Sequence, residues 1–340
     1  MSVETIEHTG TGAEFEIHEH GANIISFKPV VSSTEDLKEN REILFVSRES
    51  KVLPIRGGIP IHFPIVPPFG PKQDMPEGGY LQHNNWTCDV DYKYDAKSDA
   101  AVQYSLLSTN VTNARGHGLW AAAEPGAVSY SADCVYNIKV RGPQLTAALT
   151  IKNTSSSRAN TFPFQLLFHS YFKVANEAAM DPDECYVKGL EGYIRQDKAI
   201  DSNIMEEQSA DPVVLKEEEE THYVFDPKGH MKKDLDVIVG IGEGRSLHLT
   251  ANAKIDDTEV PVTCVVWNPG RTKARKIPDF GSAEWMEMIG VQPGILERHM
   301  LQPNQTLVFE YSIKLLAHEK EEEAWSRAEA DGDQGGQAQE

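Results

Sequence analysis

Segments whose side chains alternate between apolar and polar recur along the chain, and the first 180 residues contain no amphipathic helix pattern of ordinary length. Alternation is typical of β-strands, because successive side chains point to opposite faces of a sheet. The alternating segments are residues 15–20, 24–27, 101–106, 135–140, 145–152, 246–250, 260–267 and 306–315. Many strands and few helices predict an all-β fold, either a sandwich or a closed barrel.

Residues 161–174 (TFPFQLLFHSYFKV) predict a buried strand that ends at a histidine. One face carries only Phe and Leu side chains, at positions 162, 164, 166 and 168. The other face carries Gln165, Leu167, His169 and Tyr171, a mixed surface of the kind that lines a pocket. His169 is either a hydrogen-bonded core histidine or a general acid or base, and this segment alone leaves both open.

Residues 54–71 are rich in proline and glycine and cannot form a regular helix. Isoleucine and phenylalanine residues are interleaved with them. We therefore expect a long loop that packs against the protein and has a functional role.

The formal net charge of −20 argues against nucleic acid and against an anionic membrane surface as partners. Four distant cysteines without a CxxC pair indicate free thiols in a reducing cytosol and no zinc site: Cys88, Cys134, Cys185 and Cys264. The N-terminus has no signal peptide pattern. We expect a cytoplasmic monomer with an N-terminal extension (1–14), one domain (15–318) and a disordered acidic tail (319–340).

Four groups of motifs, in this order, resemble one family. They are IRGGIP at 55–60, GYLQHNNW at 79–86, LFHSYFK at 167–173, and VVWNP at 265–269 followed by DFG at 279–281 and VQPG at 291–294. The chain resembles the glucose-6-phosphate 1-epimerase branch of the aldose 1-epimerase (galactose mutarotase-like) family from about residue 15 to 315. The resemblance implies a β-supersandwich with an open sugar-binding cleft and no metal or organic cofactor. The small-molecule partner would be a sugar or sugar phosphate.

The family opens the sugar ring with a general acid at the ring oxygen and a general base at the anomeric hydroxyl. His169 matches the catalytic histidine of the family, whereas Gln292 stands where the family has its catalytic glutamate. An amide cannot accept the proton, although it keeps the shape of the acid. Glu297, beyond the turn, is the alternative base. We expect His169 and Gln292 to face each other across one cleft.

The family also carries a histidine near the sugar and an arginine for the 6-phosphate, at positions that Gly78 and Gln82 occupy here. His83 is adjacent to the second position, but an imidazole is not a bidentate phosphate clamp. Arg56 matches the other phosphate-binding arginine.

Three further positions match substrate-binding residues of the family. The acidic residue before a strand aligns with Glu220, or with His222 if a gap is placed differently, and we choose Glu220 because it keeps the carboxylate. Trp267 is either a platform for a sugar ring or a core tryptophan. Asp279 is either a site residue or a turn cap.

Two functions fit this pattern. The first is a hexose-6-phosphate mutarotase, an isomerase that interconverts α and β anomers with His169 as acid and a weakened or relocated base. The second is a catalytically inactive member of the family that binds carbohydrate or serves as a scaffold. Gln292, Gly78 and Gln82 favour the second function. The retained residues His169, Arg56, Trp267 and Asp279 favour a working cleft.

Overall fold

The computed structural model describes residues 2–30, 42–64, 76–89, 91–92, 99–107, 131–155, 161–198, 205–225 and 233–316. Within these residues strands dominate, and every pair of named strands is antiparallel. The helices described are short: α1 (Gly270–Ala274) and the 3₁₀ helices η1 (Leu81–His83), η4 (Ala175–Met180) and η5 (Glu284–Glu287). The predicted all-β fold is confirmed.

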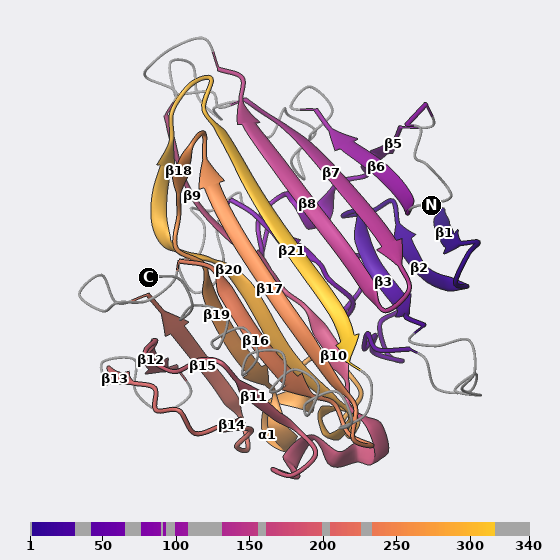
Figure 1. Cartoon of the computed structure of the whole chain (residues 1–340), viewed down its shortest axis with the longest axis vertical. Helices are drawn as coiled ribbons and strands as arrows, with labels where there is room; N and C mark the ends of the chain where they lie inside the picture. Colours follow the sequence, from indigo (N-terminus) through magenta and orange to yellow (C-terminus); the bar gives the residue numbers. More distant parts are fainter. Residues whose placement is uncertain are drawn as a thin grey trace, which may run out of the picture.

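A ten-stranded sheet contains the longest hairpins of the molecule, and its central strands run side by side in Figure 1. In spatial order its strands are β14 (Val213–Val214), β11 (Tyr186–Lys188), β16 (Leu235–Gly240), β17 (Ser246–Ile255), β21 (Thr306–Leu316), β8 (Gln144–Asn153), β7 (Ala132–Arg141), β6 (Ala100–Leu106) and β5 (Thr87–Cys88), with β18 (Thr258–Glu259) paired to β17. Inward side chains alternate with outward ones along β7, β8, β17 and β21, as the sequence predicts.

An eight-stranded sheet packs against it. Its order is β13 (Glu206–Glu207), β12 (Ile194–Asp197), β15 (Glu219–Val224), β19 (Thr263–Asn268), β20 (Met288–Leu301), β9 (Phe162–Phe168) and β4 (Ile61–His62), with β10 (Tyr171–Lys173) paired to β20. The strand predicted over 161–174 is interrupted after Phe168, and β10 resumes at Tyr171. The backbone N–H of His169 donates instead to the Pro60 carbonyl, at 2.9 Å.

A three-stranded sheet consists of β1 (Val3–His8), β2 (Ala13–His18) and β3 (Asn23–Lys28). The hairpin predicted between residues 15–20 and 24–27 is present as β2 and β3. Residues 1–14 were expected to form an extension outside the domain. The structure differs, because Val3–His8 pairs along its length with β2 and so belongs to a sheet. The outer face of β1 is exposed and charged, so its sequence lacks the apolar content that marks a strand.

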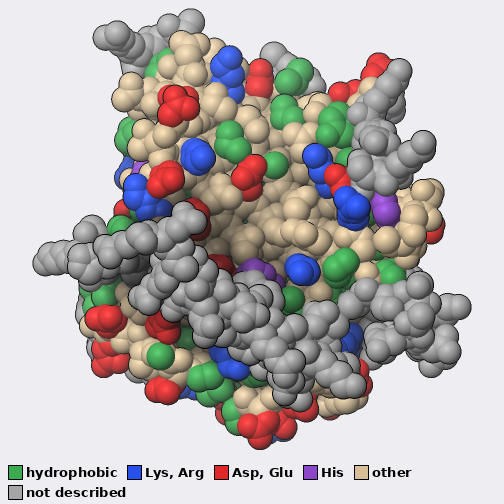
Figure 2. All heavy atoms as spheres, in the orientation of Figure 1, with side chains coloured by type: hydrophobic (Ala, Val, Ile, Leu, Met, Phe, Trp, Pro, Cys, Tyr) green, Lys and Arg blue, Asp and Glu red, His purple; other side chains and the backbone are tan. Residues whose placement is uncertain are grey.

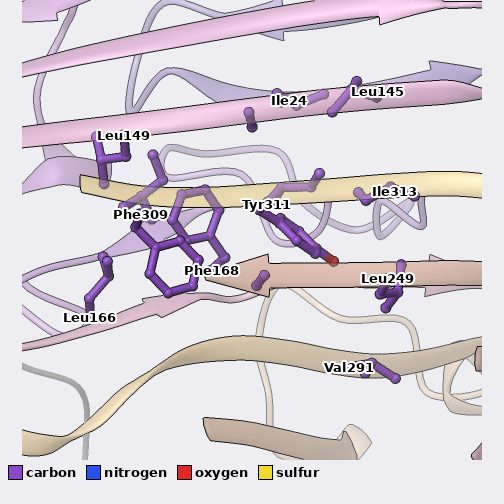
Figure 3. Close-up of a cluster of buried hydrophobic side chains, with 14 of the residues drawn as sticks. Ile24, Leu145, Leu149, Leu166, Phe168, Leu249, Val291, Phe309, Tyr311 and Ile313 are labelled. Atoms are coloured by element: carbon purple, nitrogen blue, oxygen red, sulfur yellow. The ribbon is translucent and has the colours of Figure 1, made fainter. Parts of the chain in front are cut away.

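The main hydrophobic core lies between the two large sheets. Phe168 of β9 stacks on Phe309 of β21 with ring centroids 4.9 Å apart and contacts Tyr311 edge-on at 5.7 Å. Figure 3 shows these rings among aliphatic side chains from both sheets. The apolar face predicted for residues 162–168 is therefore the core face, and the mixed face of the same strand points away from the core.

The opposite face of the ten-stranded sheet is hollowed in its middle, where mainly uncharged side chains and backbone are visible between charged groups (Figure 2). A groove of about 320 Å³ lies there. Its lining residues are Asn137, Lys139, Thr146, Ala147, Ala148, Thr250, Asn252, Glu310, Tyr311 and Ser312.

The described part of the predicted loop 54–71 packs against the core, since Ile59, Ile61 and Phe63 are fully buried. Residues 65–71 of this loop and the predicted tail 319–340 lie outside the described residues. The four cysteines are free thiols. No helix among the described residues is long and apolar enough to cross a membrane.

Candidate active site

Three of the predicted site residues, Glu220, Trp267 and Gln292, lie on strands of the eight-stranded sheet. Register explains this grouping: Glu220 of β15 pairs with Trp267 of β19, which pairs with Gly290 of β20, which in turn pairs with Tyr171 of β10. The four positions form one row across the sheet, and side chains in such a row share a face. Gly290 has no side chain, and its neighbours fill the space: a Cβ there would lie 2.8 Å from the Gln292 amide nitrogen and 3.3 Å from Cβ of Trp267.

His169 lies at the end of β9, beside this row. Its ring centroid is 4.8 Å from Tyr171, 6.0 Å from Trp267 and 4.6 Å from His62. The side chain is partly exposed on one side and enclosed by protein on the others. A partly exposed ring among three other aromatic rings favours the site interpretation over that of a core histidine.

Gln292 contacts His169 directly, with its Nε2 atom 3.5 Å from Nδ1 of the imidazole. The two side chains come together as predicted, but they do not face each other across a cleft, because no sugar fits into 3.5 Å. Gln292 lies two residues beyond Gly290 on the same face of β20, and it is only 1% exposed.

The pKa of His169 lies well below its usual value. Burial is the largest cause, and the charges of His62 and Arg56 act in the same direction. The nearby side chain in the glutamate position is an amide, so no carboxylate there offsets these effects. His169 is therefore a neutral imidazole at neutral pH.

Arg56 and Asp279 form an ion pair at the edge of the site. Nε of Arg56 donates to both carboxylate oxygens at 3.2 Å, and Nη2 donates to Oδ1 at 3.1 Å. Burial opposes the charge of Arg56, but Tyr171 and Asp279 outweigh it and raise the pKa of the guanidinium above its usual value. Asp279 is thus the counter-ion of Arg56 and more than a turn cap.

Gln82 and His83 bind the chain's own backbone. Nε2 of Gln82 donates to the Glu77 carbonyl at 2.6 Å, and Nε2 of His83 lies 2.9 Å from the same oxygen. These contacts use polar atoms that a substrate would otherwise engage. Neither side chain is paired with Arg56.

Glu220 lies beside Trp267, with a carboxylate oxygen 3.5 Å from Nζ of Lys273. His222 points to the same face but is 5% exposed, and burial followed by the charge of Lys198 lowers its pKa to about 4. Trp267 is partly exposed and contacts Tyr171 edge-on at 5.6 Å, so it is not a core tryptophan.

Glu297, the alternative base, is exposed on β20. Its carboxylate acts on the pKa of His299, which burial lowers, and it is not among the groups that shift the pKa of His169. The register shift between Ile295 and His299 carries this part of β20 away from the row of site residues.

His62 is the site residue that the sequence analysis did not identify. Its ring is stacked on His169 with an interplanar angle of 26°. Burial lowers its pKa to about 3, and the charges of Arg56 and His83 act in the same direction. A hydrogen bond with Gln82 has the opposite, smaller effect and raises the pKa. The sequence pattern that could have identified it is the alternation of Ile59, Ile61 and Phe63. These three side chains are buried, so the side chain of residue 62 points to the opposite face.

The described residues contain no group of three or more His, Cys, Asp or Glu side chains that could hold a metal ion. The site itself offers two imidazoles as proton-transfer groups, with aromatic rings, two ion pairs and a buried amide around them.

A family model described as aldose 1-epimerase matches residues 3–314. A Cenchrus ciliaris protein provisionally named a glucose-6-phosphate 1-epimerase is 26% identical over 302 residues, covering 85% of this chain and 78% of that protein.

Two solved structures share the fold. A Salmonella typhimurium protein provisionally described as a mutarotase has a TM-score of 0.67 at 17% identity, over 90% of this chain and 88% of that one. A galactose mutarotase related enzyme from Lactobacillus acidophilus has a TM-score of 0.63 at 13% identity, over 93% of this chain and 98% of that one.

Proposed function

Because the chain belongs to the aldose 1-epimerase family, we propose that it is a hexose mutarotase that accepts hexose 6-phosphates and interconverts their α and β anomers. The observation that carries this proposal is the grouping of the His169, Tyr171 and Trp267 rings, each within 6.0 Å of the other two, beside the buried amide of Gln292. The proposed location is the cytoplasm, where the four free thiols stay reduced, and the proposed state is a monomer.

Ring opening of a hemiacetal needs one proton removed from the anomeric hydroxyl and one delivered to the ring oxygen. The proposed acid is His169, and the proposed platform for the apolar face of the sugar is Trp267, since aromatic faces pack well against such surfaces. Glu220, held by Lys273, is the proposed acceptor for sugar hydroxyls.

The proposed preference for a 6-phosphate is weak. The positive charge of Arg56 is already compensated by Asp279, and Gln82 supplies no second cation. A charge-assisted contact contributes roughly 1.5–3 kcal/mol, so the loss of one such contact lowers the preference considerably.

One observation favours a second candidate, a carbohydrate-binding protein without catalysis. Gln292 is buried in the glutamate position and leaves His169 neutral, so neither group of this pair exchanges protons readily at neutral pH. Binding by Trp267 and Glu220 requires no such exchange.

Anomer exchange of glucose and glucose 6-phosphate, followed by NMR exchange spectroscopy with and without protein, separates the candidates. A mutarotase accelerates exchange, and His169→Asn removes the acceleration while sugar binding in calorimetry persists. Binding of either sugar without acceleration supports the second candidate. If the protein neither binds nor accelerates, the site has no role in sugar chemistry.

A further inference from the structure

His62 is held in the site by the short strand β4. It pairs with Leu167 of β9, so its side chain emerges on the same face as His169. The two imidazole rings are stacked, with centroids 4.6 Å apart and planes 26° from parallel. Both imidazoles therefore lie on the same face of the sheet, close enough together to contact one bound molecule.

Gly78 and Gln82 surround His62 on its other side. Gly78 has a φ of +73° and no side chain, and a Cβ there would lie 2.9 Å from the Cδ2 and Nε2 atoms of His62. The space next to residue 78 is thus filled by an imidazole that comes from β4. Gln82 is anchored on the Glu77 carbonyl and hydrogen-bonds His62, which fixes the ring.

The electrostatic surroundings keep His62 unprotonated at neutral pH. The groups around it are Arg56, His83, His169 and Gln82, and burial is the largest cause of its low pKa, at about 3. An unprotonated imidazole can accept a proton, whereas the amide of Gln292 cannot.

We propose that His62 is the base of this active site and accepts the proton of the anomeric hydroxyl that Gln292 cannot accept. This role rests on the mutarotase function proposed above. In the active form, the two imidazoles together carry one proton more than two neutral rings. His169, when protonated, donates to the ring oxygen as the bond between that oxygen and the anomeric carbon breaks, and His62 takes the hydroxyl proton as the carbonyl forms.

Ring closure on the other face of the carbonyl reverses both transfers and returns the pair to its starting state. No oxidant, metal or further proton is required. Both rings are neutral at neutral pH, so the active form is the minor one in which the pair has taken up one proton. Uptake of a second proton is disfavoured by like-charge repulsion between rings 4.6 Å apart.

The test is a set of variants assayed by anomer exchange of glucose and glucose 6-phosphate. His62→Gln keeps a hydrogen-bonding side chain but cannot accept a proton. We expect kcat to fall about 100-fold or more while KM changes little, as for loss of a positioned base. His62→Phe keeps an aromatic ring on His169 and is the second variant if β4 does not tolerate glutamine. His248→Asn, on β17 of the other sheet, is the matched histidine control and should retain wild-type kcat.

A structural role for His62 predicts a different result in a double-mutant cycle. If His62 is the base, Gln292→Glu supplies a replacement, and its gain in kcat should be at least tenfold larger in the His62→Gln background than in the wild type. Equal gains in both backgrounds, or wild-type kcat in His62→Gln, overturn this proposal alone. Absence of exchange by the wild-type protein overturns the proposed function and the role of His62 with it.

Discussion

Replacing Gln292 by glutamate tests the central feature of the site. The new carboxylate keeps the shape of the amide and would lie about 3.5 Å from Nδ1 of His169. Two unit charges 4 Å apart contribute about 4 kcal/mol at an effective dielectric constant of 20, and one pKa unit corresponds to about 1.4 kcal/mol. The pKa of His169 should therefore rise by up to about three units.

The expected functional result follows from that shift. More His169 is protonated at pH 7, and a titratable carboxylate is present next to it, so kcat/KM for anomer exchange should increase about 100-fold or more. The assay is NMR exchange spectroscopy, combined with titration of the His169 ring carbon signals to measure its pKa. Gln144→Glu, the same change at an exposed position on β8, is the matched control and should alter neither quantity.

Two results contradict this reasoning. If the His169 pKa does not rise in Gln292→Glu, the contact at 3.5 Å does not couple the two groups. If the gain in kcat/KM persists when His169 is replaced by alanine, the carboxylate acts without the proposed acid. A separate outcome, loss of wild-type activity in Glu297→Gln, would mean that the base lies further along β20.

Three other predictions follow from the charges of the described residues. Asp279→Asn removes the counter-ion of Arg56. In this variant, calorimetry should show that the ratio of the affinity for glucose 6-phosphate to the affinity for glucose rises about tenfold or more. In the wild-type protein, an affinity ratio of a thousandfold or more would contradict the proposed weak preference for the phosphate. The low pKa values of His62 and His169 leave most of the pairs without the proton that the active form carries. Wild-type kcat/KM should therefore rise up to tenfold per pH unit as pH falls from 8 to 6. A kcat/KM that is constant or falls over this range would contradict the proposal that the active pair carries one proton. His222 has a pKa of about 4 in the folded protein and about 6.5 in the unfolded chain, so its contribution to stability is complete above pH 6.5 and is lost as pH falls toward 4. The free energy of unfolding, measured with denaturant at several pH values, should change with pH by about 1.4 kcal/mol per pH unit more in the wild type than in His222→Leu within this window. Parallel plots of unfolding free energy against pH would disprove the assignment.

The sequence predicts the fold well because its strongest signal is local. Alternation along residues 162–168 assigns the core face of β9 correctly, since each inward side chain is apolar whatever it contacts across the sandwich. The strand Val3–His8 was not identified because it contains only two apolar side chains, Val3 and Ile6, and depends on pairing with β2. Pairing of this kind is decided by tertiary structure, not by the segment itself.

The site was predictable in part. The proximity of His169 and Gln292 follows from the family resemblance, and the register across β9 and β20 explains it. The Arg56–Asp279 ion pair joins residues 223 positions apart, and no local pattern indicates that the charge of Arg56 is compensated. His62 lies in a loop whose alternation spans only five residues, too few to assign a face with certainty from sequence.

The charges of the described site residues cancel although the whole chain carries −20. Arg56 is compensated by Asp279 and Glu220 by Lys273, while His62, His169 and Gln292 are neutral at neutral pH. A neutral sugar therefore meets no charge barrier here, whereas a sugar phosphate approaches against the field of an acidic protein. That field is screened beyond about 8 Å at physiological ionic strength, so local groups decide affinity once the ligand is bound. The proposed weak phosphate preference is thus a property of the Arg56–Asp279 pair, and the net charge of the chain affects chiefly the association rate.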